Sequence, residues 1–115
     1  MFHKVKALGL PVNFILVSDH GMARVNRENP IELDRKSFDL EGVRVYGGET
    51  QLNLYVKNPE RIPFIYDSLR KKQNLFKVYL KKDFPKQYHY GTEDDIYGRI
   101  GDIILMAVQP CSICR

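Results

Sequence analysis

The chain has 115 residues, of which 43% are hydrophobic and 28% are charged, and its formal net charge is +4. These values predict one globular domain with its own core, and they exclude a disordered chain and a disulfide-rich scaffold, since the sequence has only 2 cysteines. The positive charge is spread along the sequence rather than gathered in one segment, which argues against a nucleic-acid-binding platform.

The beginning of the sequence predicts a short helix followed by a buried strand. Apolar residues recur at helical spacing within residues 1–8, and Gly9 and Pro11 then supply stop signals. Residues 12–17 read VNFILV, a nearly continuous apolar run that is typical of a strand buried on both faces of a sheet. The polar residues 18–22 predict a turn directly after this strand.

Strand signals recur in the next part of the sequence. Residues 31–33 are a short strand candidate, whereas residues 43–46 and 51–56 show the alternation of side chains that is typical of half-buried strands. Gly47 and Gly48 lie between the two longer segments, and this glycine pair predicts that they form a β-hairpin.

The second half of the sequence predicts one helix and two more strands. Asn58 is a suitable N-cap and Pro59 suits the first helical position. Residues 76–80 and 102–108 predict strands, and residues 87–101 predict a long loop between them. The helix should bury the apolar residues that repeat at helical spacing, Ile62, Ile65, Tyr66 and Leu69. A buried strand followed by a β-β-α-β unit predicts an α/β fold, with α+β as the alternative.

The two cysteines, Cys111 and Cys114, form a C-x-x-C pair at the end of the sequence. The pair does not open a helix after a strand, as a redox motif would, and no second pair completes a tetrahedral zinc site. We therefore expect an untethered tail with two reducible thiols, and a redox or metal-binding role is the alternative.

Asp19 and His20 are the sharpest candidates for a functional site. They adjoin at the carboxyl end of the predicted buried strand, which is the edge where open α/β sheets bind ligands. Carboxylate and imidazole are both good zinc ligands, and Gly21 lets the chain turn so that both side chains face one ion. The alternative is that Asp19 caps the turn and His20 is simply exposed.

His89 is the second candidate ligand. It lies between Tyr88 and Tyr90 in the predicted loop, where packing of the neighbouring rings could hold the imidazole in one orientation. The alternative is a loop histidine that is simply solvated or hydrogen-bonded and binds no metal ion. The acidic residues 93–95 are typical of a solvated turn, with a site for a hard cation as the alternative.

Two segments resemble the nucleotide pyrophosphatase/phosphodiesterase family, the type I phosphodiesterases of the alkaline phosphatase superfamily. Residues 13–22 read NFILVSDHGM, which resembles the strand and S-D-H-G-M signature of that family. Residues 84–90 read FPKQYHY and residues 99–103 read RIGDI, which is similar to the family's later Pro-Lys-x-x-His-Tyr stretch and Arg-Ile-x-x-Ile strand. The resemblance covers residues 1–108 and ends at a divergent tail, residues 109–115.

The resemblance implies a hydrolase with two zinc ions that cleaves phosphodiester or pyrophosphate bonds, and in which a threonine or serine attacks phosphorus. It implies that Asp19 and His20 bind the zinc that activates this nucleophile, and that His89 binds the other zinc. Catalytic domains of the family are several times longer than this chain, and they carry the nucleophile and the remaining ligands before the S-D-H-G-M signature. The chain therefore resembles the C-terminal portion of an alkaline-phosphatase-like catalytic domain and holds no catalytic nucleophile.

These observations lead to two hypotheses of different classes. The first is a C-terminal fragment of a zinc-dependent phosphodiesterase, inactive alone, whose full-length form acts on a nucleotide or another phosphodiester. The alternative is a non-catalytic binding or dimerising module derived from the same family, with a second copy of the chain, in a homodimer, as one partner. The resemblance suggests a secreted, periplasmic or ectodomain protein, although the first residues lack the apolar core of a signal peptide. No apolar run reaches the about 18 residues that cross a bilayer.

Overall fold

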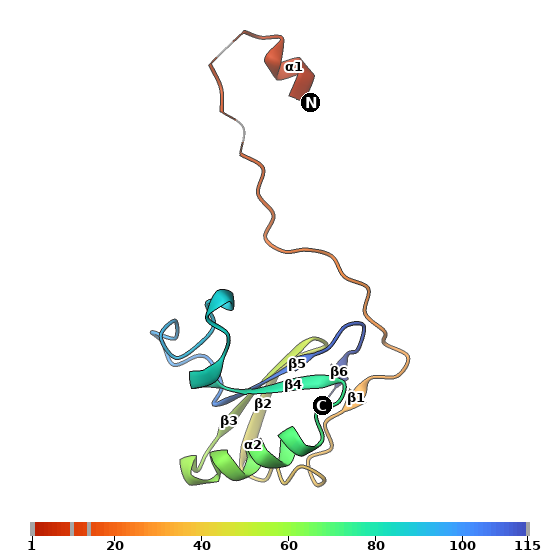
Figure 1. The fold of residues 1–115 in the computed structure, drawn as a ribbon, viewed down its shortest axis with the longest axis vertical. Coiled ribbons are helices and arrows are strands. Elements are labelled where there is room, and N and C mark those ends of the chain that lie inside the picture. The colour runs from red at the N-terminus through yellow and green to blue at the C-terminus, as the bar shows by residue number, and fades with distance from the viewer. Residues whose placement is uncertain (1, 10, 14, 115) are drawn as a thin grey trace.

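The computed structural model describes residues 2–9, 11–13 and 15–114, which form a folded body and an N-terminal arm (Figure 1). The body is built on a four-stranded antiparallel sheet with the strand order β2-β3-β5-β4. A separate two-stranded parallel sheet joins β1 to β6. The helices and strands are α1 (Phe2–Lys6), β1 (Ile31–Glu32), β2 (Val43–Gly48), β3 (Gln51–Val56), α2 (Ile62–Lys71), β4 (Phe76–Leu80), β5 (Ile103–Ala107) and β6 (Ile113–Cys114). Three short 3-10 helices complete them: η1 (Pro59–Arg61), η2 (Lys81–Asp83) and η3 (Lys86–Tyr88).

The predicted β-hairpin is confirmed, and its turn lies slightly later than the glycine pair. β2 and β3 pair from Val43 opposite Val56 to Gly48 opposite Gln51, so the two linking residues are 49 and 50. Gly47 has a φ of 109°, and a Cβ there would lie 2.3 Å from the backbone oxygen of Gln51. Glycine is therefore required at Gly47, but as part of the strand end rather than as the turn itself.

The predicted helix start is also confirmed. The side chain of Asn58 accepts a hydrogen bond of 3.1 Å from the backbone N–H of Glu60, and Pro59 opens the first turn. That turn is a 3-10 helix, so α2 begins three residues later at Ile62. Ile65 and Leu69 lie on the buried face of α2 as their spacing predicts. Among the described residues, no helix is long and apolar enough to cross a membrane.

The hydrophobic core lies between α2 and one face of the four-stranded sheet. β3 and β5 are the two central strands, and Leu52 of β3 and Val78 of β4 both lie opposite Leu105 of β5. Leu52 and Leu105 are completely buried, as are Ile65 and Leu69 of α2. The alternate residues of β3, Gln51, Asn53 and Tyr55, face the other way and are half-buried. Asn53 and Tyr55 form hydrogen bonds to the loop between β4 and β5.

The prediction of a buried strand over residues 12–17 is wrong. No described residue of this segment is in a strand, and it runs extended along the arm away from the body (Figure 1). Ile15, Leu16 and Val17 are 85%, 100% and 82% exposed, while Phe14 lies outside the described residues. A strand buried on both faces needs strands at its edges and helices over its faces, and the described residues place neither beside the arm.

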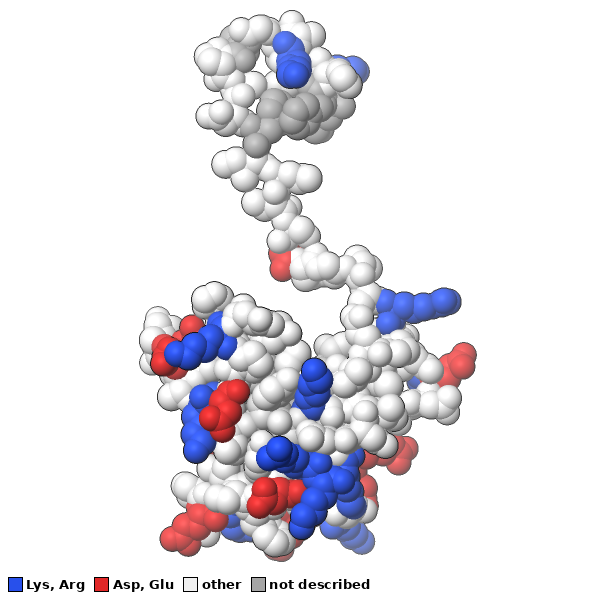
Figure 2. Space-filling view, in the orientation of Figure 1, with Lys and Arg blue, Asp and Glu red and all other residues white. Residues whose placement is uncertain are grey.

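The visible face of the body mixes basic and acidic side chains, whereas the arm is mostly uncharged (Figure 2).

The prediction of an untethered tail is wrong as well. Ile31 of β1 pairs with Ile113 of β6 in parallel, and the hydroxyl of Ser112 donates a hydrogen bond of 2.7 Å to the carbonyl of Asn26. Ile113 and Ser112 are buried, and Cys111 and Cys114 are half-buried free thiols. The pairing joins residues about eighty positions apart, so local sequence patterns do not reveal it.

Candidate functional site

Asp19 and His20 lie in the extended arm with their side chains directed toward each other. His20 Nε2 is 3.5 Å from Asp19 Oδ2, and both side chains are largely exposed. His20 Nδ1 lies 2.8 Å from the carbonyl oxygen of Gly21. A carbonyl oxygen only accepts, so this contact is a hydrogen bond when Nδ1 carries a proton. The pair places a carboxylate oxygen and an imidazole nitrogen side by side, and both side chains face solvent.

His89 lies in the loop between β4 and β5, at the end of η3. Its backbone is left-handed, with φ 48° and ψ 47°, and its side chain is 86% exposed. The rings of its neighbours Tyr88 and Tyr90 both pack against Phe84, with centroids 5.7 Å apart in each case. His89 Nδ1 is 3.9 Å from Asp94 Oδ1, so one carboxylate faces the imidazole within the same loop.

The three predicted ligands lie in two separate segments, a pair in the arm and one histidine in the loop. Their chemistry suits zinc, which is bound by imidazole and carboxylate groups. Zinc takes three or four protein ligands, however, and the described residues contain no group of three His, Cys, Asp or Glu side chains that could hold a metal ion together. The donors that this chain brings together do not fit a complete zinc site.

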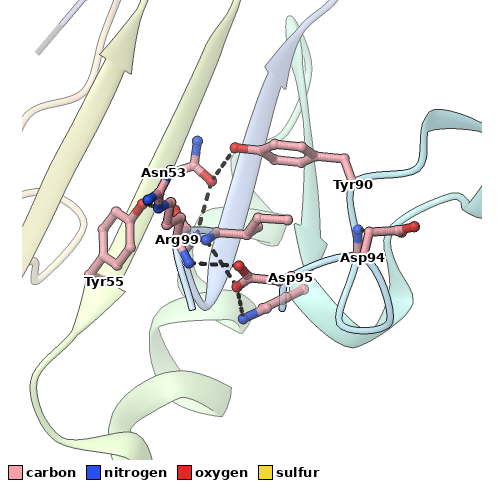
Figure 3. Close-up of polar contacts among 10 residues, drawn as sticks. Asn53, Tyr55, Tyr90, Asp94, Asp95 and Arg99 are labelled. Carbon is pink, nitrogen blue, oxygen red and sulfur yellow. Dashed lines mark hydrogen bonds and ion pairs between the residues drawn. The ribbon is translucent and has the colours of Figure 1, made fainter. Parts of the chain in front are cut away.

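The most tightly held acidic side chain in the loop is Asp95, which sequence analysis placed in a solvated turn. Only 3% of this side chain is exposed. It accepts hydrogen bonds from Lys81 Nζ and from the backbone N–H groups of Arg99, at 2.6 Å, and Ile100, at 3.0 Å (Figure 3). The hydrogen bond from Lys81, together with those from the two backbone N–H groups, lowers the pKa of Asp95 to about 2.

Asn53 and Tyr55 attach the end of the loop to the central strand β3 (Figure 3). Asn53 Oδ1 accepts hydrogen bonds from the backbone N–H of Gly101, at 3.1 Å, and from the Tyr90 hydroxyl, at 3.3 Å. The Tyr55 hydroxyl donates to the carbonyl of Arg99, and burial raises the pKa of Tyr55. These residues were not predicted from the sequence, although a polar Asn53 between two buried leucines of a strand was a usable signal.

We expect the stability of the protein to fall in acid partly through Asp95. Its folded pKa of about 2 lies below the ordinary value of 3.8, so the charged carboxylate stabilises the fold above pH 3.8, and this contribution is lost as the pH falls from 3.8 to about 2. The difference in unfolding free energy between the natural chain and Asp95→Asn should therefore be largest near neutral pH and shrink toward pH 2. Urea denaturation at several pH values measures it. A difference that does not change with pH would contradict the expectation.

Similarity to known proteins covers nearly the whole chain. The family model of type I phosphodiesterases/nucleotide pyrophosphatases matches residues 2–114. The chain belongs to this family. The predicted resemblance is thereby confirmed, and so is the mixed α/β fold, since the solved structures that it matches are phosphodiesterase domains of the alkaline phosphatase type.

Individual phosphodiesterases match the chain over a small part of their own length. A venom phosphodiesterase from Crotalus durissus collilineatus is 33% identical over 89 residues, which are 70% of this chain and 10% of that protein. The bis(5′-adenosyl)-triphosphatase ENPP4 from Bos taurus is 32% identical over 116 residues, 93% of this chain and 22% of that protein. The solved structure of murine ectonucleotide pyrophosphatase/phosphodiesterase 5 is 28% identical with a TM-score of 0.69, and the match covers 85% of this chain and 25% of that one. The chain thus spans a quarter or less of each of these phosphodiesterases.

Proposed function

We propose that this chain is the C-terminal portion of a zinc-dependent phosphodiesterase catalytic domain and is inactive alone. In the complete domain, Asp19 and His20 would bind one zinc ion and His89 the other. The substrate class we propose is a nucleotide or another compound with a phosphodiester or pyrophosphate bond. The names of the relatives support this class, since one is a venom phosphodiesterase and another a bis(5′-adenosyl)-triphosphatase.

The observation that carries the proposal is the incomplete donor set in a chain that spans a quarter of a matched phosphodiesterase. Asp19 and His20 present a carboxylate oxygen and an imidazole nitrogen 3.5 Å apart, but no third donor joins them among the described residues. A catalytic zinc site uses three protein ligands and one open position. Segments of a longer polypeptide would supply the missing ligands and the nucleophile.

The purified chain should show no phosphodiesterase activity of its own. A chromogenic aryl phosphodiester, incubated with the chain and zinc, should be hydrolysed no faster than in a blank with zinc alone. Two variants serve as a matched pair: His20→Ala removes a proposed ligand, and His3→Ala removes an exposed histidine elsewhere in the arm. Turnover that is abolished by a chelator and by His20→Ala, but not by His3→Ala, would show that the chain assembles a working site by itself.

The same variants test the zinc-binding half of the proposal. Calorimetric titration of the chain with zinc should detect weak binding that His20→Ala removes and His3→Ala leaves in place, since two donors hold a zinc ion less firmly than three or four. Equal binding by the chain and by His20→Ala would count against Asp19 and His20 as the ligand pair.

The exposed arm favours the alternative of a dimerising module. Ile15, Leu16 and Val17 form a consecutive apolar run in water, which a second chain could cover by pairing with it. A dimer has twice the mass of the 13.4 kDa chain, and sedimentation equilibrium with and without zinc measures it. A zinc-independent dimer that Ile15→Asp converts to a monomer would support the module, whereas a monomer would exclude it.

A further inference from the structure

The loop between β4 and β5, residues 81–102, is attached to the body at its start, middle and end. At its start, the Phe84 side chain is buried and its ring packs on Tyr79 of β4 with centroids 5.2 Å apart. At its end, Gly101 lies so close to β3 that a Cβ there would be 2.8 Å from the backbone nitrogen and oxygen of Leu54. Asp102 also accepts a hydrogen bond of 2.8 Å from the backbone N–H of Val56, so the end of the loop is held along β3.

Asp95 attaches the middle of the loop. Its partner Lys81 comes directly after β4, and this pair is much less exposed than the ion pair of Lys86 with Glu93 in the same loop. An exposed pair contributes little because water and salt screen it, whereas a buried carboxylate with three donors holds its neighbours in one arrangement. Two of those donors are the backbone N–H groups of Arg99 and Ile100, so Asp95 also closes the loop onto itself.

Asn53 links the end of the loop to the residue beside His89. Its single side-chain oxygen accepts from Gly101 and from Tyr90, as Figure 3 shows for Asn53 and Tyr90. Tyr90 follows His89 directly, and its ring packs on Phe84. The position of His89 is therefore set by its neighbours, because its own side chain is exposed and no buried contact holds it.

The backbone of His89 requires such support. A φ of 48° is uncommon for a residue with a side chain, and such conformations persist only where the surrounding structure holds them. The contacts of Tyr88 and Tyr90 hold the residues on both sides of His89, and the contacts of Asp95 hold the part of the loop that follows.

We propose that Asp95 is a positioning residue: together with Lys81 and Asn53 it holds the loop so that the backbone of His89 is fixed in one place on the body. This inference rests on the proposed function, because holding His89 in place contributes to catalysis only if His89 binds a metal ion. The fixed arrangement of the loop is a separate physical claim, and it can be measured on the chain without metal or substrate.

The test compares Asp95→Asn with Glu93→Gln in the full 115-residue chain. Both variants remove one negative charge from the same loop, but Asp95 is buried and Glu93 is exposed. Hydrogen exchange by NMR should show the amides of Arg99 and Ile100 exchanging about tenfold faster or more in Asp95→Asn, the factor expected for roughly one lost hydrogen bond. The ring signals of His89 should shift in the same variant, while amides of β3 and β5 keep their exchange rates. Glu93→Gln should change none of these.

Two results would overturn the inference. One is an Asp95→Asn chain in which the loop amides and the His89 ring signals are unchanged. The other is faster exchange of the β3 and β5 amides by the same factor as the loop, because Asp95 would then act on the stability of the whole fold rather than on the position of the loop.

A second variant keeps the test decisive if Asp95→Asn does not fold. Tyr90→Phe removes only the hydroxyl that bonds Asn53 and keeps the ring on Phe84. It should shift the His89 ring signals without lowering the midpoint of global unfolding, and unchanged signals would contradict the inference. His89→Ala distinguishes the two proposals, because it removes the proposed metal ligand but none of the contacts that hold the loop. The loop amides of this variant should therefore exchange at the same rate as those of the natural chain, whether or not His89 binds a metal ion.

Discussion

Leu105→Ala should lower the free energy of unfolding by about 3 kcal/mol, within the range of about 2–5 kcal/mol known for buried leucines. Leu105 is completely buried in the central strand β5, and it lies opposite Leu52 on one side and Val78 on the other. Truncation removes apolar contacts and leaves a cavity that two paired strands and a helix cannot close. Urea denaturation followed by circular dichroism measures the loss.

The matched control for this prediction is Leu75→Ala. Leu75 precedes β4 and is 46% exposed, so its truncation should cost less than about 1 kcal/mol. Equal losses for the two leucines would show that β5 is not a buried central strand, and this would contradict the strand order β2-β3-β5-β4.

Gly101→Ala should destabilise the fold by about 2 kcal/mol although it adds a single methyl group, within the about 1–3 kcal/mol typical of overpacking. The added carbon would lie 2.8 Å from both the nitrogen and the oxygen of Leu54 and 3.0 Å from Asn53 Cβ. Two of these atoms belong to the backbone of a central strand, which cannot move without breaking its pairing on both sides. The end of the loop should therefore move away from β3, and the hydrogen bond from the Gly101 backbone N–H to Asn53 Oδ1 should be lost.

Gly48→Ala is the control for this second prediction. A Cβ at Gly48 meets nothing within 4 Å, so alanine there should change the unfolding free energy by less than about 0.5 kcal/mol. Thermal and urea unfolding of both variants give the comparison. If alanine is tolerated equally at the two positions, the loop does not lie as close to β3 as the structure shows.

The body of this protein was predictable from the sequence because its elements depend on local signals. The N-cap at Asn58, the apolar repeat that buries Ile65 and Leu69, and the alternation along β3 each act within a few residues. Their order correctly predicted the β-β-α-β unit and the mixed α/β fold. The two signature segments likewise predicted the family, which the match over residues 2–114 confirms.

The arm shows where the same reasoning fails. The run VNFILV has the composition of a strand buried on both faces, but composition does not show whether neighbouring strands and helices are present to bury it. In the described structure Leu16 is fully exposed because neither strands nor helices lie against the arm. The ligand roles of Asp19, His20 and His89 stay predictions for the same reason. A zinc site that includes them needs further ligands, and the described residues do not bring such ligands together.

The sequence by itself determined the local elements of the body, the turn and cap residues that bound them, and the family to which the chain belongs. The tertiary structure alone decided the strand order β2-β3-β5-β4, the pairing of β6 with β1, and the burial of Asp95 in the loop that carries His89. The physical reason is distance along the chain: Lys81 meets Asp95 across 14 positions and Asn53 meets Gly101 across 48. Such contacts form only when the whole sheet brings the segments together, so no local pattern of residues encodes them.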